Sequence, residues 1–255
     1  MATYALSDIH GEWNILKTIL KFLKKDDKLI FLGDANDRGP APVTCMRALL
    51  EDSRVTYLRG NHEEFFSRFL TIYGTEEESQ WMSGWVQNGG RATLKELREY
   101  SSDEIADMIE KVSQLPIFAE YTNAKGEKFI LCHAGYTPEY TEELEPTWDR
   151  EHFEDKWVDN EYDYLVHGHT PIPYICDVID GWEAIQYCNG HKIDIDLATY
   201  YTKKAALLNL DDLSVTYFEE DYYTITLDAP GKDVNWYTMP SCYKTEKVHV
   251  PRRDK

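Results

Sequence analysis

The sequence predicts an α/β fold built from layered, mixed β-sheets. In the first half of the chain, short apolar runs of strand length alternate with stretches whose apolar residues recur at helical spacing. In the second half, strand-like runs crowd together. This pattern favours mixed sheets over a purely parallel sheet. The 255 residues contain no internal repeat, low-complexity tract or linker, so we expect a single domain over residues 1–255.

Strands and helices are expected to alternate before residue 74. The first helix is predicted because Trp13, Leu16, Ile19 and Leu23 share one face of an amphipathic pattern that ends near residue 24. Two prolines precede a second helix, and a third follows a polar turn. The remaining predictions for this part are strands over 4–6, 29–32 and 55–58, with helices over 43–50 and 65–73.

Residues 74–90 break this rhythm. They combine an acidic run at 76–78 with Trp81, Trp85 and an Asn-Gly-Gly sequence. Aromatic residues in a loop-like segment often shape a pocket, so one interpretation is an inserted lid or cap. The other is a segment packed against the edge of the domain. The residues alone favour neither.

The second half begins with a helix and continues as strands. Ser101 and Glu104 have the spacing of a capping box, which predicts a helix over 101–114. Residues 123–126 are typical of a hairpin turn between two strands. A turn is expected at Asp211 and Asp212, and the charged tail, 244–255, is expected to be frayed. The predicted strands are 118–121, 128–132, 164–166, 193–197, 205–210, 215–219 and 222–227.

The composition limits the classes of partner. Lys plus Arg is 27 and Asp plus Glu is 46, which gives a formal charge of −19. Nucleic acid and anionic membranes are bound through positive surface, so neither is expected as a partner. Five cysteines without a CxxC pair, no signal peptide and no apolar run of about 20 residues predict a cytoplasmic protein. The sequence does not indicate the oligomeric state.

Five predicted strands end in a candidate metal ligand beside a glycine. In α/β sheets, ligands gather at the carboxyl ends of strands, so these side chains are expected to meet. Three histidines, two aspartates and an asparagine are too many for one tetrahedral ion and fit two ions with open positions. Nitrogen and oxygen donors without thiolate favour manganese, iron or zinc. The candidates are Asp8, His10, Asp34, Asn61, His133 and His169.

Residues 33–39 carry two carboxylates and an arginine between two glycines. Carboxylates bind hard cations, and a planar guanidinium binds phosphate through two parallel hydrogen bonds. Alone, this segment could be an ordinary polar turn, and it becomes informative because four other segments repeat the same design. Because the overall charge is negative, attraction of a phosphate must be local.

Five motifs resemble, in order, those of the calcineurin-like metallophosphoesterases. The resemblance spans residues 4–171, and three departures (Ser7, Asn36 and Ala134) remove no ligand. The Asp-Arg-Gly and Asn-His-Glu forms are similar to the phosphoprotein phosphatase branch. Residues 85–90 and 148–150 are similar to its bacterial and phage (lambda-like) members. The motifs are Ser7-Asp8-Ile9-His10-Gly11, residues 33–39, Gly60-Asn61-His62-Glu63, His133-Ala134-Gly135 and Gly168-His169-Thr170.

The resemblance implies a central sandwich of mixed sheets flanked by helices. It also implies a serine/threonine protein phosphatase that hydrolyses phosphomonoesters by direct attack of a hydroxide bridging two metal ions, with no phospho-enzyme. The metals would be divalent or trivalent, with manganese first and iron or zinc next. Asp34 would bridge the ions, Asp8 and His10 would complete one site, and Asn61, His133 and His169 the other.

The resemblance also assigns the remaining roles. His62 would give a proton to the leaving oxygen, and Asp37 would orient His62 and keep it charged. Arg38, Arg150 and Asn61 would hold the phosphate. Simpler roles stay open, because Asp37 could cap a turn, Arg38 could form a surface salt bridge and Arg150 lies in a variable loop.

Several residues are predicted to have no catalytic role. Trp148 is expected to pack rather than contact substrate, and His167 to be inert. The remaining histidines, His152, His191 and His249, are expected to be structural or exposed.

The sequence leaves the substrate open. A dinucleoside polyphosphate hydrolase acting on diadenosine tetraphosphate would use a similar metal core. A non-catalytic scaffold could keep the fold as a binding surface, but such a protein typically loses ligands or the proton donor, and all are present here. Substrate choice is expected to depend on residues 74–90 and the C-terminal loops.

Overall fold

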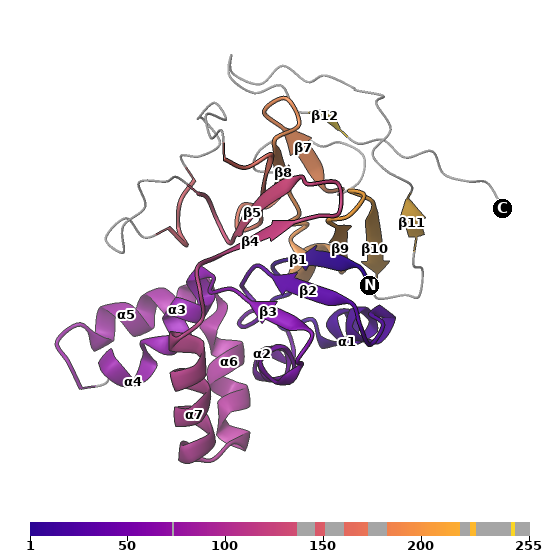
Figure 1. The fold of residues 1–255 in the computed structure, drawn as a ribbon. Helices are drawn as coiled ribbons and strands as arrows, with labels where there is room; N and C mark the ends of the chain where they lie inside the picture. The colour runs from indigo at the N-terminus through magenta and orange to yellow at the C-terminus, as the bar shows by residue number, and fades with distance from the viewer. Residues whose placement is uncertain are drawn as a thin grey trace.

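The computed structural model describes residues 1–72, 74–136, 146–150, 161–172, 183–219, 225–227 and 246–247. Within this part, two six-stranded mixed sheets lie face to face (Figure 1). The order of the first sheet is β11 (Ile225–Leu227), β10 (Val215–Glu219), β9 (Lys204–Asn209), β1 (Thr3–Leu6), β2 (Lys28–Phe31), β3 (Val55–Tyr57). The second runs β12 (Glu246–Lys247), β7 (Ile185–Tyr187), β8 (Lys192–Asp194), β6 (Tyr164–His167), β5 (Lys128–Cys132), β4 (Phe118–Thr122).

Each sheet combines three parallel strands with three antiparallel ones, and the parallel strands lie at one end of the first sheet and in the centre of the second. In the first, β1, β2 and β3 run parallel, and β9, β10 and β11 join as antiparallel strands. In the second, β5, β6 and β8 are parallel, whereas β4, β7 and β12 pair antiparallel. The parallel strands β1, β2, β5 and β6 therefore send their carboxyl ends to one edge, where the predicted ligands follow them. The predicted mixed-sheet α/β class is confirmed.

The main core lies between the sheets. Ala5 and Ile30 of the first sheet pack in one apolar cluster with Leu131 and Val166 of the second. Strand side chains alternate between faces, so the adjacent residue Leu6 points the other way, into a cluster shared with the helices. Parallel strands buried on both faces read as continuous apolar runs, which is why the sequence shows them clearly.

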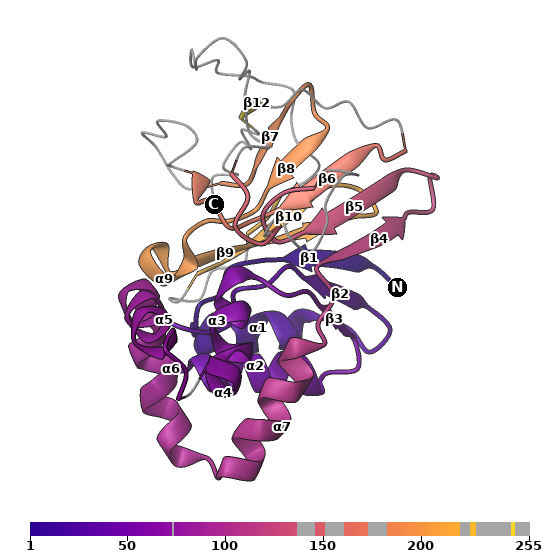
Figure 2. The same cartoon turned by 90° about the vertical axis from the view of Figure 1, so that its left-hand side faces the viewer.

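Helices cover the outer face of the first sheet (Figures 1 and 2). α1 (Trp13–Phe22) and α2 (Pro42–Glu51) pack against it through residues such as Leu16 and Met46. α7 (Ser102–Ser113) is capped by Ser101, whose hydroxyl oxygen accepts from the Glu104 amide as the capping box predicts. Every helix in the described residues is too short or too polar to cross a membrane.

The predicted helix over 65–73 begins too late. α3 (Asn61–Ser67) starts at Asn61, and α4 (Phe69–Ile72) follows after a break. Glu63 accepts a 2.8 Å hydrogen bond from the Gly60 amide, and this side-chain cap starts the helix directly after Gly60. Asn61 and His62 therefore lie in the first turn of a helix.

Within residues 74–90, a short turn over 74–77 leads into a helical segment over 78–90. α5 (Glu78–Trp85) continues into the π-helical turn η1 (Val86–Gly90) and then α6 (Arg91–Glu96). Trp85 is fully buried in the core shared with the helices. The expectation of a loop is wrong for 78–90 because aromatic residues at 81 and 85 follow helical spacing. A lid function for the segment stays a prediction.

The remaining predictions differ mainly at boundaries. The β4–β5 hairpin is confirmed, whereas β7, the short helices η2 (Leu97–Glu99) and α9 (Thr199–Thr202), and α6 were not predicted. Within the tail, only Glu246 and Lys247 belong to the described part of the chain, and they pair with β7 instead of fraying. His152 and His249 lie outside the described residues.

Candidate active site

The six predicted metal ligands lie together at the edge where β1, β2, β5 and β6 end. All six are buried, and His169 is the most exposed, at 7%. Asp8 and His10 follow β1, Asp34 follows β2, and Asn61 opens α3. The other two are His133, directly after β5, and His169, two residues after β6.

Asp34 lies between two groups of ligand atoms. Its Oδ2 is 3.5 Å from His10 Nε2 and 3.7 Å from His62 Nε2. Its Oδ1 is 3.4 Å from His133 Nε2. The donor atoms of His10, Asp34 and His62 form one cluster that could hold an ion, and those of Asp34, His133 and His169 form another. One carboxylate therefore serves both groups, each with a different oxygen.

Asn61 and Asp8 add further donors. Asn61 Oδ1 lies 2.9 Å from His133 Nε2 and 3.0 Å from His169 Nδ1, at the second group. Asp8 Oδ1 is 4.0 Å from His10 Nε2, at the first. The other Asp8 oxygen accepts from the Ser7 hydroxyl and from the His169 amide at 3.1 Å. Asp8 thus contacts one group through its side chain and fixes the loop that carries the other.

The histidine rings are oriented by main-chain carbonyls. His10 Nδ1 lies 2.9 Å from the Asn36 oxygen, and His133 Nδ1 lies 3.0 Å from the Leu32 oxygen. A carbonyl can only accept, so each Nδ1 carries the proton and each Nε2 presents a lone pair toward Asp34. This is the tautomer that a metal ligand needs.

Burial sets the charge of these groups. It lowers the pKa of His10 well below its ordinary value, helped by the nearby Arg38 cation, and it lowers the pKa of His133. Burial, with repulsion from Asp8 and Glu63, raises the pKa of Asp34 well above its ordinary value. The site combines neutral imidazoles with a carboxyl that is crowded by other acids. A bound cation would therefore stabilise it electrostatically.

The site loops hold an unusual backbone. Left-handed φ values between 43° and 67° occur at several non-glycine site residues. Each costs on the order of 1 kcal/mol, and such strain persists only where surrounding contacts enforce it. The residues are Asp8, His10, Asp34, Asp37, Arg38 and His169.

Glu63 provides much of that enforcement. Its fully buried carboxylate accepts from the amides of Asp34 at 2.7 Å and Ala35 at 2.9 Å, and from the Tyr57 hydroxyl at 2.7 Å. The Gly60 backbone lies so close that a Cβ there would be 2.3 Å from Asp34 Oδ1, so only glycine fits. Glu63 therefore ties the β2 loop to the start of α3.

A second buried pair adjoins the metal ligands. His62 Nδ1 lies 2.6 Å from Asp37 Oδ2. Asp37 is fully buried and also accepts from Trp85 Nε1 at 2.9 Å and from the Thr93 hydroxyl at 2.5 Å. Because Asp37 accepts from His62 Nδ1, the Nε2 atom of His62 faces Asp34 and the site.

The C-terminal part of residues 74–90 is fixed to this loop. Gly89 has φ of +106°, and its oxygen accepts from the Arg38 amide at 3.1 Å. A Cβ at Gly89 would lie 2.6 Å from Arg38 Cγ. With the Trp85–Asp37 contact, this makes the segment a support for residues 37 and 38.

Both predicted arginines reach the site. Arg38 Nη1 lies 2.6 Å from His10 Nε2, and its Nη2 lies 3.0 Å from His62 Nε2. The exposed Arg150 donates from Nε to His169 Nε2 at 3.4 Å. A single lone pair on His10 Nε2 cannot serve both Arg38 and a metal ion, so an ion at His10 would have to displace the Arg38 guanidinium from that nitrogen.

Several buried residues around the site were not given a role from the sequence. Glu63 and Trp85 were named there without a role, and Thr93 and the acids Asp194 and Asp196 near the end of β8 were not identified. The Asp196 amide donates to Asp194 Oδ1 at 2.9 Å, and burial raises the pKa of both carboxyls. The two acidic residues in the apolar run 193–197 were the sequence feature that could have identified them. His167, predicted to be inert, contacts the Tyr187 hydroxyl at 2.7 Å.

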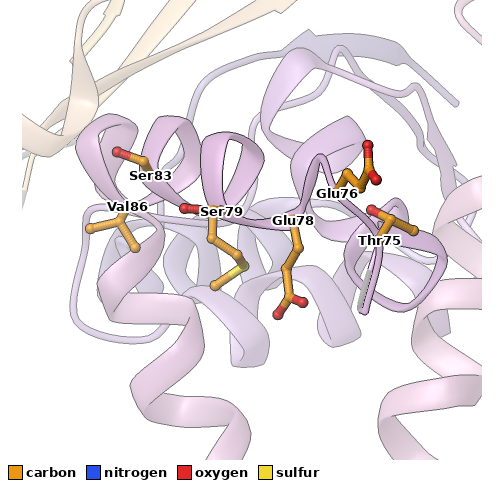
Figure 3. Close-up of a pocket in the computed structure, with 7 residues that line it drawn as sticks. Thr75, Glu76, Glu78, Ser79, Ser83 and Val86 are labelled. Carbon is orange, nitrogen blue, oxygen red and sulfur yellow. The ribbon is translucent and has the colours of Figure 1, made fainter.

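Two hollows flank α5. The larger, about 510 Å³, runs along α5 and the turn before it, and none of the predicted site residues lines it (Figure 3). The smaller, about 230 Å³, begins at Asn61 in the ligand cluster. Trp148 lines this smaller hollow with 36% of its surface exposed, so the expectation that it packs inside the protein holds only in part.

Comparison with known proteins agrees with this geometry. The chain is 32% identical to serine/threonine-protein phosphatase 2 of Escherichia coli over 136 residues, covering 52% of this chain and 58% of that protein. It is 28% identical to serine/threonine-protein phosphatase 1 of Salmonella typhimurium over 75% of this chain and 84% of that protein. It is also 26% identical to the symmetrical bis(5'-nucleosyl)-tetraphosphatase of Erwinia tasmaniensis, covering 55% of this chain and 46% of that protein.

Solved structures share the fold at low identity. A cold-active protein tyrosine phosphatase superposes with a TM-score of 0.54 at 19% identity, covering 89% of this chain and 78% of the other. A putative diadenosine tetraphosphatase superposes with a TM-score of 0.53 at 16% identity, covering 88% and 92%. A family model described as calcineurin-like phosphoesterase matches residues 1–198. The chain therefore belongs to the calcineurin-like phosphoesterase family, as its motifs and two-sheet fold predict.

Proposed function

We propose that the protein is a metal-dependent phosphomonoesterase of the serine/threonine protein phosphatase type. The observation that carries this proposal is the position of Asp34, whose two oxygens face separate groups of donors. The likeness to two bacterial proteins named serine/threonine-protein phosphatases supports the choice of substrate.

The donor set fits two metal ions, with manganese first and iron or zinc as alternatives. Asp8, His10 and Asp34 would hold one, and Asp34 with Asn61, His133 and His169 the other. Neutral imidazoles and carboxylate or amide oxygens suit these ions. When bound, the ions polarise the phosphate and activate water as the nucleophile.

The chain's own residues complete the reaction. Arg38 and Arg150 reach the cluster at His10 and at His169, where they would hold the non-bridging oxygens of the phosphate. As the ester P–O bond breaks, the departing oxygen needs a proton. His62 would supply it from Nε2, because Asp37 accepts from Nδ1 and so orients the ring with Nε2 toward the site.

A dinucleoside tetraphosphate hydrolase is the second candidate. The specific support is the likeness to the Erwinia tasmaniensis protein and to the putative diadenosine tetraphosphatase structure. Such a substrate would place a second phosphate beside the scissile one. The same donors would serve either reaction, so the metal cluster does not distinguish them.

A substrate panel tests the proposal. The protein is stripped with chelator, reloaded with Mn²⁺, and assayed on phosphoserine and phosphothreonine peptides, diadenosine tetraphosphate and p-nitrophenyl phosphate. We expect phosphate release from the peptides. Cleavage of the dinucleotide alone would replace the main proposal with the second. Turnover of none of them, with two ions bound, would indicate a non-catalytic scaffold.

A further inference from the structure

The smaller hollow is built from one face of α3 and two tryptophans. Asn61, Glu64, Phe65 and Arg68 recur at helical spacing, so they share one face of α3 and its C-terminal end. Trp81 of α5 and Trp148 form the facing walls. We call these six residues the aromatic pocket.

The aromatic pocket is continuous with the ligand cluster. Asn61 belongs to both, since its Oδ1 contacts His133 and His169. The Trp148 ring lies 6.2 Å from the His169 ring and 5.6 Å from the Phe65 ring. Phe65 in turn lies 6.1 Å from the His62 ring. A group attached to a phosphate in the cluster would therefore meet Phe65 and Trp148 first.

The walls hold each other in place. Phe65 packs edge-on against Trp81 at 5.1 Å, and Trp81 packs against the buried Trp85 at 5.5 Å. Trp148 Nε1 donates to Glu64 Oε2 at 3.1 Å, which occupies the carboxylate and fixes the indole. The pocket therefore presents rigid aromatic faces, which bind planar rings through offset or edge-on contacts.

The helical rise of α3 gives the distances between residues along the pocket. A helix rises about 1.5 Å per residue, so Phe65 lies roughly 6 Å and Arg68 roughly 10 Å beyond Asn61 along its axis. A ring bonded directly to the ester oxygen falls at the level of Phe65. A nucleobase, separated from its phosphate by ribose, extends farther. Arg68, exposed at the far end, offers a cation to an acidic group beyond the ring.

We propose that the aromatic pocket binds the leaving group of an aryl phosphate, in a protein the ring of phosphotyrosine. This proposal rests on the proposed phosphatase function. It extends that function to aryl phosphates, whose ring would bind in the aromatic pocket. Trp148, Trp81 and Phe65 are then specificity-determining residues, and Arg68 favours an acidic residue beside the phosphotyrosine.

Two peptides of one sequence, carrying phosphotyrosine or phosphoserine, test the proposal in Trp148→Leu, Trp148→Phe and wild type. Differences in intrinsic reactivity cancel when the tyrosine-to-serine ratio of kcat/KM is compared between variants. We expect Trp148→Leu to lower that ratio roughly tenfold and Trp148→Phe, which keeps a ring, to retain most of it. Phe118→Leu, which removes an aromatic side chain of 43% exposure in β4, is the control and should not change the ratio.

An unchanged ratio in Trp148→Leu would overturn the proposal. A loss in Trp148→Phe as large as in Trp148→Leu would also overturn it, because the Glu64 hydrogen bond rather than the ring would then matter. If the variants lost only diadenosine tetraphosphate cleavage, the occupant would be a nucleobase and the proposal would be wrong.

A binding measurement separates this proposal from the proposed function. Tryptophan fluorescence is titrated with phenylphosphonate and with methylphosphonate, neither of which is hydrolysed. We expect the phenyl compound to bind wild type more tightly, and this preference to fall in Trp148→Leu. Equal affinities in wild type would refute the pocket even if the enzyme is active. If the protein preferred phenylphosphonate but hydrolysed no substrate, the aromatic pocket would be supported and the phosphatase proposal would be wrong.

Discussion

Trp85 Nε1 donates to both carboxylate oxygens of Asp37, at 2.9 and 3.1 Å, across 48 residues of sequence. Asp37 in turn accepts from His62 Nδ1. A tryptophan from the helical segment 78–85 thus reaches the group that orients the proposed acid. This contact makes residues 74–90 part of the site's support.

Trp85→Phe tests that contact. The change keeps a buried ring but removes one donor to a buried carboxylate, which costs about 1.5–3 kcal/mol for a hydrogen bond to a charged group. We expect a loss of this size in the free energy of unfolding, measured in urea, and a lower kcat for substrates with poor leaving groups. Trp13→Phe trims a partly buried indole of α1, outside the active site and the aromatic pocket, and serves as the control. Equal losses in the two variants would contradict the role of the hydrogen bond.

The variant His62→Ala shows whether His62 acts as the proton donor or as a metal ligand. His62 Nε2 lies 3.7 Å from Asp34 Oδ2, close enough for either role. If it is the acid, the variant keeps its metal content, and kcat falls about 10²- to 10⁴-fold for poor leaving groups and much less for good ones. Metal analysis and a leaving-group series measure this. A uniform loss across the series, with one ion missing, would make His62 a ligand instead.

The buried carboxyl of Asp194 is expected to make the stability of the folded chain depend on pH. Burial, with the adjacent Asp196 carboxylate, raises its pKa, so the folded chain keeps a proton that the unfolded chain releases above about pH 3.9. Its contribution to stability is therefore present below that pH and is lost as the pH rises through the folded pKa. Asp194 Oδ2 also has no hydrogen-bond partner in the described structure.

Asp194→Asn should therefore raise the Tm of the chelator-treated protein at pH 8 and have little effect near pH 3.5. Thermal unfolding across this range measures the difference, with the exposed Asp26→Asn as control. A pH-independent change in Tm would mean that packing, and not ionisation, sets the effect.

The ligands of the site could be predicted because each lies within a few residues of the carboxyl end of a strand. Asp34 and His133 are fixed to β2 and β5 by chain connectivity, and parallel strands bring their ends to one edge. The sheet class followed from the same apolar runs. The ligand positions and the sheet class both depend on local patterns of apolar residues, and such patterns can be read directly from the sequence.

The supports could not be predicted in the same way. Thr93 contacts Asp37 across 56 residues, and Glu63 contacts Asp34 across 29. No periodic pattern records such contacts, because they depend on how α5, α6 and the loops pack. The start of α3 at Asn61 was missed for a related reason, since Gly60 alone is a weak helix signal and the cap comes from Glu63.

The central claim is that Asp34 joins two metal sites. Metal content per chain, measured by mass spectrometry after loading with Mn²⁺ and gel filtration, tests it most directly in wild type and Asp34→Asn. The account predicts two ions in wild type and a joint loss of affinity for both in the variant, because one carboxylate contributes an oxygen to each site. A variant that loses one ion and keeps the other at full affinity would contradict it.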